Sequence, residues 1–362
     1  MQKKLIALAV AGLASGAAFA QSNVTIYGAL DVYAGMAKAD NATGNQKQTF
    51  VNASGINGSR IGFRGEEALG NGLSAVYQLE LGSLTLDSAT NGIGTTRQSY
   101  VGLKSDKLGQ LHMGRLQTVN YYWASKYDPM NIASSFSLML KSASFTGSGS
   151  FLGTSLRVDN GVAYISPRLS GFQVSANYAV GEQVTGTSGS AGYSKAQTFY
   201  NLGLDYEKGP LSAGLVYAEM DDKGGVKNGV ASTYVKEWGL GAKYDLGFVK
   251  PHVTYQEATD RLTASLAEWK QKQWNVGVHI PVFGKDTLKL AYNNVKSNQA
   301  NAPKAQGYVA LYIHPLSKRT NVYAAFQTFH NGTYAAVGTF GDPSPSAGRN
   351  ASAYAIGMNH SF

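Results

Sequence analysis

Residues 170–180 read SGFQVSANYAV, and this stretch decides the fold. Its apolar and aromatic side chains fall on every second residue from Phe172 to Val180, and polar residues such as Gln173 and Asn177 fall between them. Successive side chains of a β-strand point to opposite faces, so the alternation predicts a strand with one apolar and one polar face. The same pattern recurs at residues 201–206, 238–246, 249–256 and 274–280.

The number and length of these segments favour a membrane barrel. About sixteen can be counted, most of them about 9–11 residues long, which is the length of a tilted strand that crosses a bilayer. Aromatic residues recur near their ends, as in the girdles at the two membrane interfaces. A soluble β-sandwich would also alternate, but its polar faces would not combine with these lengths and aromatic ends. A soluble β-propeller is disfavoured because no blade-like repeat is seen.

The connections between the segments alternate between short and long. The short connections are residues 68–72, 105–109, 167–171, 207–210, 245–247, 283–286 and 315–319. The long connections are residues 38–52, 85–95, 118–155, 181–196, 221–233, 259–268, 297–303 and 331–350. Lipid offers no hydrogen bonds to backbone groups, so the sheet must close on itself. We therefore expect an all-β fold, a 16-stranded antiparallel transmembrane β-barrel with short turns at one end and long external loops at the other.

The first twenty residues are typical of a secretory signal peptide. Lys3 and Lys4 precede the apolar run at residues 5–10, and Ala18-Phe19-Ala20 has the small-x-small pattern of a cleavage site. We therefore expect residues 21–362 to form a single barrel domain. An N-terminal membrane anchor is the alternative, but the apolar run is short and rich in Gly, Ala and Ser.

Composition excludes several other classes of protein. The chain has no cysteine, so a disulfide scaffold and a cysteine-ligated metal site are both ruled out. Its formal charge of +9 falls to +7 without Lys3 and Lys4. A basic excess can attract nucleic acid, anionic lipid or an anionic solute, and export argues against nucleic acid as a partner. The mean hydropathy of −0.18 suits a barrel in which half of the strand residues face water.

Three segments resemble the general diffusion porins of Gram-negative bacteria: residues 23–30 (NVTIYGAL), 59–72 (SRIGFRGEEALGNG) and 100–115. The resemblance covers the whole chain after residue 20, is nearest to the proteobacterial branch with neisserial-type porins, and agrees with the terminal aromatic residue Phe362. It implies a homotrimer in the bacterial outer membrane, surrounded by lipid and lipopolysaccharide. It also implies passive diffusion of small hydrophilic solutes and ions through a lumen that the inward-folded third loop narrows.

The connection at residues 117–155 fits this constricting loop. It is the longest connection, is rich in Ser and Gly, begins with Tyr121, Tyr122 and Trp123, and has no obvious secondary structure. A long loop of this kind usually has a function or is disordered, so a mobile external loop is the alternative.

Strand parity predicts which arginines point into the lumen. Ile61 and Phe63 are expected to face lipid, so Arg60 and Arg64 on the alternate positions face the lumen. A charge on the lipid face would cost roughly 2–4 kcal/mol at the middle of the bilayer, which supports the inward assignment. Arg64 lies nearer a turn and is assigned less firmly to the constriction.

Two further arginines follow from the same rule. Val162 and Tyr164 are expected to face lipid, which places Arg157 inside, and Arg97 is expected inside because it is opposite in phase to Tyr100. By resemblance, Arg60, Arg97 and Arg157 match the basic side of the porin constriction. Ordinary solvated arginines at the rim of the barrel are the alternative.

The charge balance of the loop predicts a preference for anions. Asp128 is the only acid between residues 118 and 155, against Lys126 and Lys141. The candidate pore constriction therefore consists of Arg60, Arg64, Arg97, Arg157, Lys126 and Asp128. Other charges on lumen parity are Lys243, Lys250 and Lys289, offset in part by Asp31, Glu80, Glu237 and Asp245. Rings of one charge sign set the ion preference of a pore.

No sequence motif indicates an enzyme. None of the six histidines lies in an H-E-x-x-H spacing, and neither a G-x-S-x-G elbow nor a phosphate-binding loop is present. We therefore expect no catalytic, metal-binding or cofactor-binding residues. His252 and His279 lie on lumen parity, so a barrel enzyme stays open as an alternative, together with a substrate-specific porin and an adhesin.

Overall fold

The computed structural model describes residues 23–82, 86, 96–143, 156–180, 197–222, 226–227, 230–262, 268–341 and 344–362. The expected signal peptide and residues 144–155 of the third long loop lie outside this described part of the chain.

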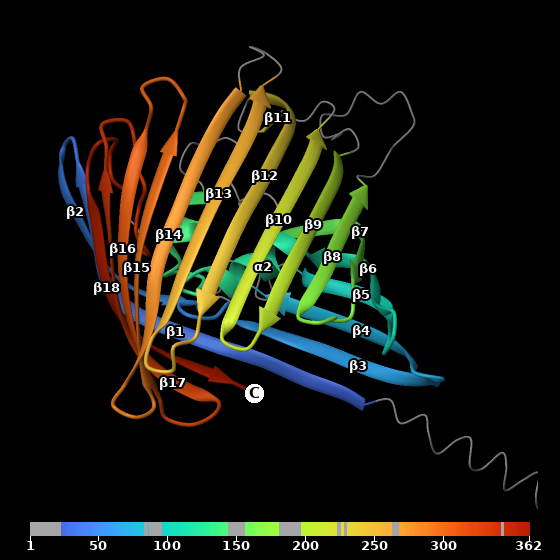
Figure 1. Ribbon diagram of the computed structural model, residues 1–362. Helices are drawn as coiled ribbons and strands as arrows, with labels where there is room; N and C mark the ends of the chain where they lie inside the picture. The colour runs from blue at the N-terminus through green and yellow to red at the C-terminus, as the bar shows by residue number, and fades with distance from the viewer. Residues whose placement is uncertain are drawn as a thin grey trace, which may run out of the picture.

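A closed antiparallel barrel dominates the structure (Figure 1). β1 pairs with β18 along one edge and with β3 along the other, so no barrel edge is left open. Among the described residues the barrel has sixteen strands, as the sequence predicted. These are β1 (Asn23–Asn41), β3 (Arg60–Gly70), β4 (Leu73–Gly82), β5 (Thr96–Ser105), β6 (Gly109–Gln117), β7 (Arg157–Ile165), β8 (Phe172–Val180), β9 (Gln197–Lys208), β10 (Leu211–Asp222), β12 (Val230–Tyr244), β13 (Lys250–Leu262), β14 (Glu268–Val282), β15 (Asp286–Ser297), β16 (Lys304–Pro315), β17 (Thr320–Asn331) and β18 (Ala351–Ser361).

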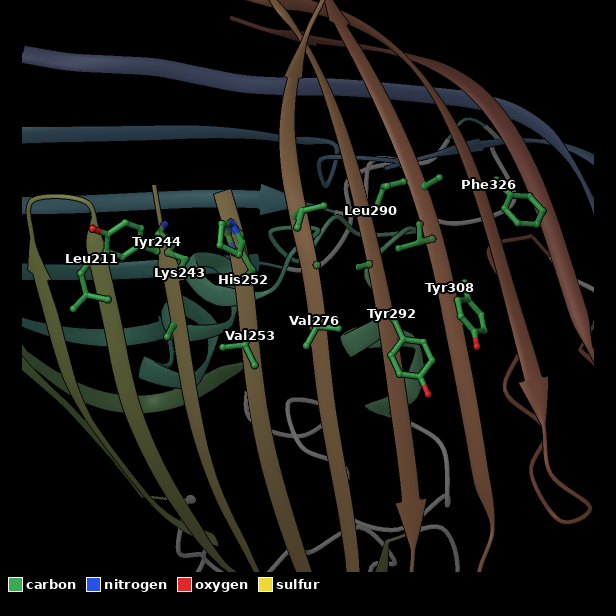
Figure 2. Close-up of a pocket in the computed structure, with 17 residues that line it drawn as sticks. Leu211, Lys243, Tyr244, His252, Val253, Val276, Leu290, Tyr292, Tyr308 and Phe326 are labelled. Carbon is green, nitrogen blue, oxygen red and sulfur yellow. The ribbon is translucent and has the colours of Figure 1, made fainter. Parts of the chain in front are cut away.

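The two faces of the barrel wall have the chemistry that the alternation predicted. On β8, Phe172 and Val174 are about half exposed, at 50% and 47%, whereas Asn177 is only 5% exposed. Figure 2 shows the outward face of β12 to β17, where Val253, Val276 and other apolar side chains surround a shallow hollow. Apolar side chains therefore face outward, and polar side chains line the interior.

Several strands are longer than the sequence suggested. β1 has 19 residues and continues into a hairpin with β2 (Gly44–Ala53), so the expected long loop at residues 38–52 is wrong. Strands also extend into the expected loops at 221–233 and 259–268, where the short strand β11 (Val226–Lys227) pairs with β12. The hairpin of β1 and β2 carries polar residues on both faces, which hid the strand pattern in the sequence.

β2 and β3 lie one after the other along the same side of β1. β1 pairs with β3 through residues 23–29 and with β2 through residues 32–41. The residues between β2 and β3, residues 54–59, form an interruption that is not part of the sheet. The carboxylate of Asp31 accepts hydrogen bonds from the backbone N–H groups of Gly55, Ile56 and Asn57 at 2.9, 3.0 and 2.8 Å. The interruption is therefore fastened to the barrel wall by a buried acid.

The third long loop contains two helices, α2 (Val119–Tyr127) and α3 (Leu138–Ala143), so the expectation of a loop without secondary structure is wrong. Thr118 caps α2 by accepting a hydrogen bond from Tyr121 N at 3.1 Å. Val119, Trp123 and Tyr127 recur at helical spacing and pack against the inner wall. That spacing was a sequence signal for the helix. Neither helix is long and apolar enough to cross a membrane.

Side chains of many strands hold this loop inside the barrel. Asn177 on β8 accepts from Val119 N at 2.7 Å, and Asn201 on β9 accepts from Asn120 N at 3.0 Å. Farther along the loop, Gln327 on β17 donates to Phe136 O at 3.1 Å. The described part of the loop therefore runs along the inner wall from β8 to β17, and Figure 1 shows α2 within the barrel.

The connection after β17 also folds inward. Phe340 is fully buried and packs edge-to-face on Phe136, with ring centroids 4.8 Å apart. Tyr33 of β1 joins this aromatic cluster, and Phe340 N donates to the side chain of Gln327 at 3.1 Å. Two long connections therefore fill one side of the interior and leave the wall of β3 to β7 on the other side.

Candidate pore constriction

The wall opposite the packed loops carries a cluster of charges. Arg60 begins β3, Glu80 lies on β4, Arg97 lies on β5 and Arg157 begins β7. The carboxylate of Glu80 joins two of the arginines, with Oε1 at 2.6 Å from Arg97 Nε and Oε2 at 3.4 Å from Arg60 Nε. Two guanidinium groups thus contact one acid, and Arg157 joins the cluster across Tyr121, so the cluster holds two positive charges in excess.

Neutral hydrogen-bond donors also hold Glu80. Tyr27 on β1 donates from its hydroxyl to Glu80 Oε2 at 2.9 Å, and Gln78 Nε2 donates to the Tyr27 hydroxyl at 2.6 Å. Glu80 is only 4% exposed. Its charge is therefore turned toward the wall, while the arginines present the remaining positive charge to the lumen.

Tyr121 of α2 lies between two of the arginines. Arg97 Nη2 is 3.4 Å from the Tyr121 hydroxyl, and the guanidinium carbon of Arg157 lies 5.5 Å from the centre of the Tyr121 ring. This contact brings the inward loop against the basic wall. We call the group formed by Arg60, Arg97, Arg157 and Tyr121, where α2 approaches β3, β5 and β7, the candidate aperture, or aperture for short.

Arg97 points inward for a reason that strand parity misses. The prediction that Arg97 lies inside because it is opposite in phase to Tyr100 requires Tyr100 to face lipid. This premise is wrong, because the Tyr100 hydroxyl donates to Gln78 inside the barrel at 3.0 Å. Regular alternation from Tyr100 would then turn Arg97 outward. Instead, the register between β4 and β5 shifts beyond the pair Glu80 and Gln98, so Arg97 is an extra residue in a β-bulge. Bulges re-aim side chains in this way.

A glycine makes room for the redirected arginine. A Cβ atom on Gly82 would lie 2.1 Å from Cδ of Arg97, which no real side chain could tolerate. Gly82 therefore allows the stem of Arg97 to cross β4 and reach Glu80.

Arg157 lies beside a second irregularity of the wall. The register between β6 and β7 shifts between Gly114 and Leu116, and Asn160 on β7 has a left-handed φ of 52°. The contact with Tyr121 nevertheless places the guanidinium of Arg157 in the interior. Two of the three arginines at the aperture thus lie beside breaks in the regular sheet, and for Arg97 the break sets the direction of the side chain.

The interruption at residues 54–59 positions Arg60. Arg60 Nη1 donates to Gly58 O at 2.9 Å, and Ser135 of the inward loop donates from its backbone N–H to Gly55 O at 3.0 Å. Asp31, which fastens this segment, is fully buried. It therefore acts as a structural acid and does not face the water of the lumen.

The two loop residues in the predicted constriction lie away from the three arginines. Lys126 forms ion pairs with Asp205 at 2.7 Å and Glu207 at 2.8 Å on β9. Asp128 is 1% exposed, and its carboxylate accepts from Ile132 N at 2.8 Å. Burial raises the pKa of the Asp128 carboxyl above its ordinary value. Lys126 thus anchors α2 to the wall, and the hydrogen bond to Asp128 stabilises the turn of the chain after α2.

Arg64 lies apart from the aperture. It is four residues from Arg60 toward the short turn after β3, and its guanidinium carbon lies 5.1 Å from the centre of the Tyr27 ring. Its side chain is exposed to the lumen. The three aperture arginines and Arg64 therefore occupy two separate levels of the same wall.

Several other charges on lumen parity have local partners. The contacts are Lys250 with Asp245 at 2.7 Å, Lys289 Nζ with Asn131 Oδ1 at 2.6 Å, and Asn120 Nδ2 with Glu237 Oε2 at 2.9 Å. These groups fasten the loop or pair on the wall. Sequence parity placed the charged members on the lumen side but could not identify their partners.

The two lumen histidines contact the backbone of the inward loop. The rings of His252 and His279 lie with centroids 4.3 Å apart and planes tilted by 32°, and their ring nitrogens contact the backbone oxygens of Tyr127 and Pro129. Within the described ranges, no group of three or more His, Asp or Glu side chains is arranged to hold a metal ion.

Comparison with known proteins agrees with this architecture. The family model described as Gram-negative porin matches residues 7–334. Outer membrane porin protein 32 of Delftia acidovorans is 31% identical, and an outer membrane porin protein of Bordetella pertussis is 28% identical, with complete coverage of both chains in each case. The solved anion-selective porin from Comamonas acidovorans is similar in structure, with 26% identity, a TM-score of 0.80 and coverage of 94% of this chain and 100% of that one. The barrel, its inward loop and these matches show that the chain belongs to the Gram-negative porin family.

Proposed function

We propose that this outer-membrane porin is a passive diffusion channel for small hydrophilic solutes and ions, and that Arg60, Arg97 and Arg157 give it a preference for anions. One observation carries the proposal: Arg60 and Arg97 share the single carboxylate of Glu80, and Arg157 joins them across Tyr121 of the inward loop. Membership of a family of channels also means that the chain is not an enzyme.

The charge balance across the aperture supports the direction of this preference. In the described part of the loop, the one acid, Asp128, is buried, so it offers no exposed carboxylate opposite the arginines. A cleft lined by one sign of charge raises the local concentration of the opposite ion. The similar porin from Comamonas acidovorans is named as anion-selective, which favours the same assignment here.

Several properties of the assembled protein complete the proposal. We infer that the signal sequence is removed after Ala20 and that the chain forms a homotrimer surrounded by lipid and lipopolysaccharide. Similarity to porins, one of which is described in a trimer form, supports this assembly. We also propose that the loop at residues 117–155 sets the size limit of the channel. No cofactor or energy source is required for diffusion.

The selectivity is tested by the reversal potential of the refolded protein in a planar bilayer across a gradient of potassium chloride. We expect the wild-type potential to favour chloride. Replacing Arg60, Arg97 and Arg157 together by Gln leaves Glu80 as the charge at the aperture, so the potential should move to the potassium side. Adding Glu80→Gln to that variant removes the last charge and should bring the potential close to zero.

The matched control removes three positive charges elsewhere. Lys285, Lys318 and Arg319 lie in exposed short turns, and their replacement by Gln should leave most of the chloride preference intact. A wild-type potential that favours potassium would overturn the proposal. So would an equal shift in the turn control, because the preference would then reflect net charge and not the aperture.

A further inference from the structure

A second basic site lies on the short-turn side of the aperture. A polar hollow of about 610 Å³ opens there, lined by Arg64, Glu66, Gln78, Tyr100, Lys104 and Gln110. Arg64 lies four residues along β3 from Arg60, which is about 13 Å in an extended strand. An anion that has passed the three aperture arginines would therefore meet this hollow next.

Arg64 is the free cation of the hollow. It forms no ion pair with any residue that the structure describes, in contrast to Arg60 and Arg97, which share Glu80. The other cation of the hollow is neutralised, because Lys104 Nζ lies 3.0 and 2.9 Å from the two carboxylate oxygens of Glu66. The hollow thus holds one uncompensated positive charge.

An aromatic ring orients the guanidinium of Arg64. Its central carbon lies 5.1 Å from the centre of the Tyr27 ring, within the range of a cation–π contact. Gly62 lies under that ring, where a Cβ atom would be 2.4 Å from Tyr27 Cζ, so the ring rests flat against the wall. A guanidinium that lies over a ring can direct N–H groups away from the ring, and these groups form a fork that matches two oxygens of a carboxylate.

The wall of the hollow is held rigid by its own hydrogen bonds. Tyr100 donates from its hydroxyl to Gln78 Oε1 at 3.0 Å, Gln78 donates to Tyr27 at 2.6 Å, and Tyr27 donates to Glu80 at 2.9 Å. These hydroxyl protons are already used within the wall. Arg64 is left as the charged donor for a ligand, with the rings of Tyr27 and Tyr100 beside it.

We propose that Arg64 is the centre of a binding station for the carboxylate of a small organic acid, separate from the arginines that set ion preference. The aperture attracts anions by charge alone, whereas the Arg64 fork holds a carboxylate by two parallel hydrogen bonds. The inference rests on the proposed function only in requiring that anions enter the channel.

The test compares acetate with chloride in single-channel recordings of the refolded full-length barrel. Wild-type conductance in potassium acetate should saturate with concentration. Arg64→Gln should raise the half-saturating acetate concentration about tenfold or more, because both charge-assisted hydrogen bonds are lost and the loss of even one corresponds to about tenfold. It should leave the chloride reversal potential nearly unchanged. Arg64→Lys keeps the charge but not the fork, so it should raise the acetate value and leave chloride conductance close to wild type.

Arg319→Gln is the matched control, because it removes an exposed arginine from the short turn before β17, outside the hollow. Three outcomes would overturn the station: conductance in acetate without saturation, wild-type acetate behaviour in Arg64→Lys, or the same change in Arg319→Gln as in Arg64→Gln. A wild-type reversal potential that favours potassium would instead contradict the proposed anion preference. The two proposals can thus fail separately.

Discussion

Replacing Asp31 by Asn tests whether a buried acid holds the aperture together. The two carboxylate oxygens accept four hydrogen bonds, from the N–H groups of Gly55, Ile56 and Asn57 and from the hydroxyl of Tyr323. An amide has only one oxygen, so two of these donors lose their acceptor. Each lost bond to a charged group is worth about 1.5–3 kcal/mol, which gives a local destabilisation of about 3–6 kcal/mol.

The loss should release the segment at residues 54–59 while the barrel stays closed. A change of about 3 kcal/mol or more shifts a local equilibrium by at least roughly a hundredfold. Ser135 of the inward loop would lose its contacts with Ser54 O and Gly55 O, which are 2.9 and 3.0 Å long in the native structure. Arg60 would lose the fixed position of Gly58 O.

Amide hydrogen exchange and bilayer recordings measure these effects. In Asp31→Asn, the amides of residues 55–57 should exchange at least roughly a hundredfold faster, and the open-channel current should become noisier. Asp245→Asn is the control, because Asp245 is an exposed acid that pairs with Lys250 at a short turn. Unchanged exchange at residues 55–57 in a folded Asp31→Asn barrel would refute the structural role assigned to Asp31.

Two further predictions concern the geometry of the aperture and the anchor of α2. Gly82→Val should displace Arg97, since even a Cβ atom would lie 2.1 Å from Arg97 Cδ. The chloride preference should then fall as far as in Arg97→Gln. An unchanged reversal potential would show that Arg97 does not need the space beside Gly82. Lys126→Gln removes the ion pairs with Asp205 and Glu207, which should lower stability by only about 1 kcal/mol because the lysine is partly exposed. In Lys126→Gln, the midpoint of thermal denaturation should fall slightly, the current noise should increase, and the reversal potential should stay on the chloride side. A reversal potential on the potassium side would instead place Lys126 in the aperture.

Regular alternation was enough to predict the barrel from the sequence. On β8, for example, Val174 faces outward and Asn177 faces inward, as expected. The rule failed where polar residues occupy both faces, as in the hairpin of β1 and β2. It also missed α2, although Val119, Trp123 and Tyr127 carry the spacing of a packed helix face.

The site was less accessible to sequence reasoning. Arg97 was placed inside on the wrong premise that Tyr100 faces lipid. Strict alternation of side chains cannot reveal an extra residue in a bulge, and that residue is what turns Arg97 inward. Asp31 and Asp128 were counted as pore charges, yet both are buried among donors that lie far away in the sequence or in the loop itself. Pairing partners of this kind become visible only once the chain is folded.

The bulge at Arg97 allows this side chain to face the lumen without changing which of the following residues face lipid. In a regular strand, moving a charge from lipid to water requires every following residue to change sides as well. Here one additional residue absorbs the change, so the outward positions Val101 and Leu103 keep their contact with hydrocarbon. A porin can therefore gain or lose a pore charge through the insertion or deletion of a single residue, while its lipid-facing side chains stay the same.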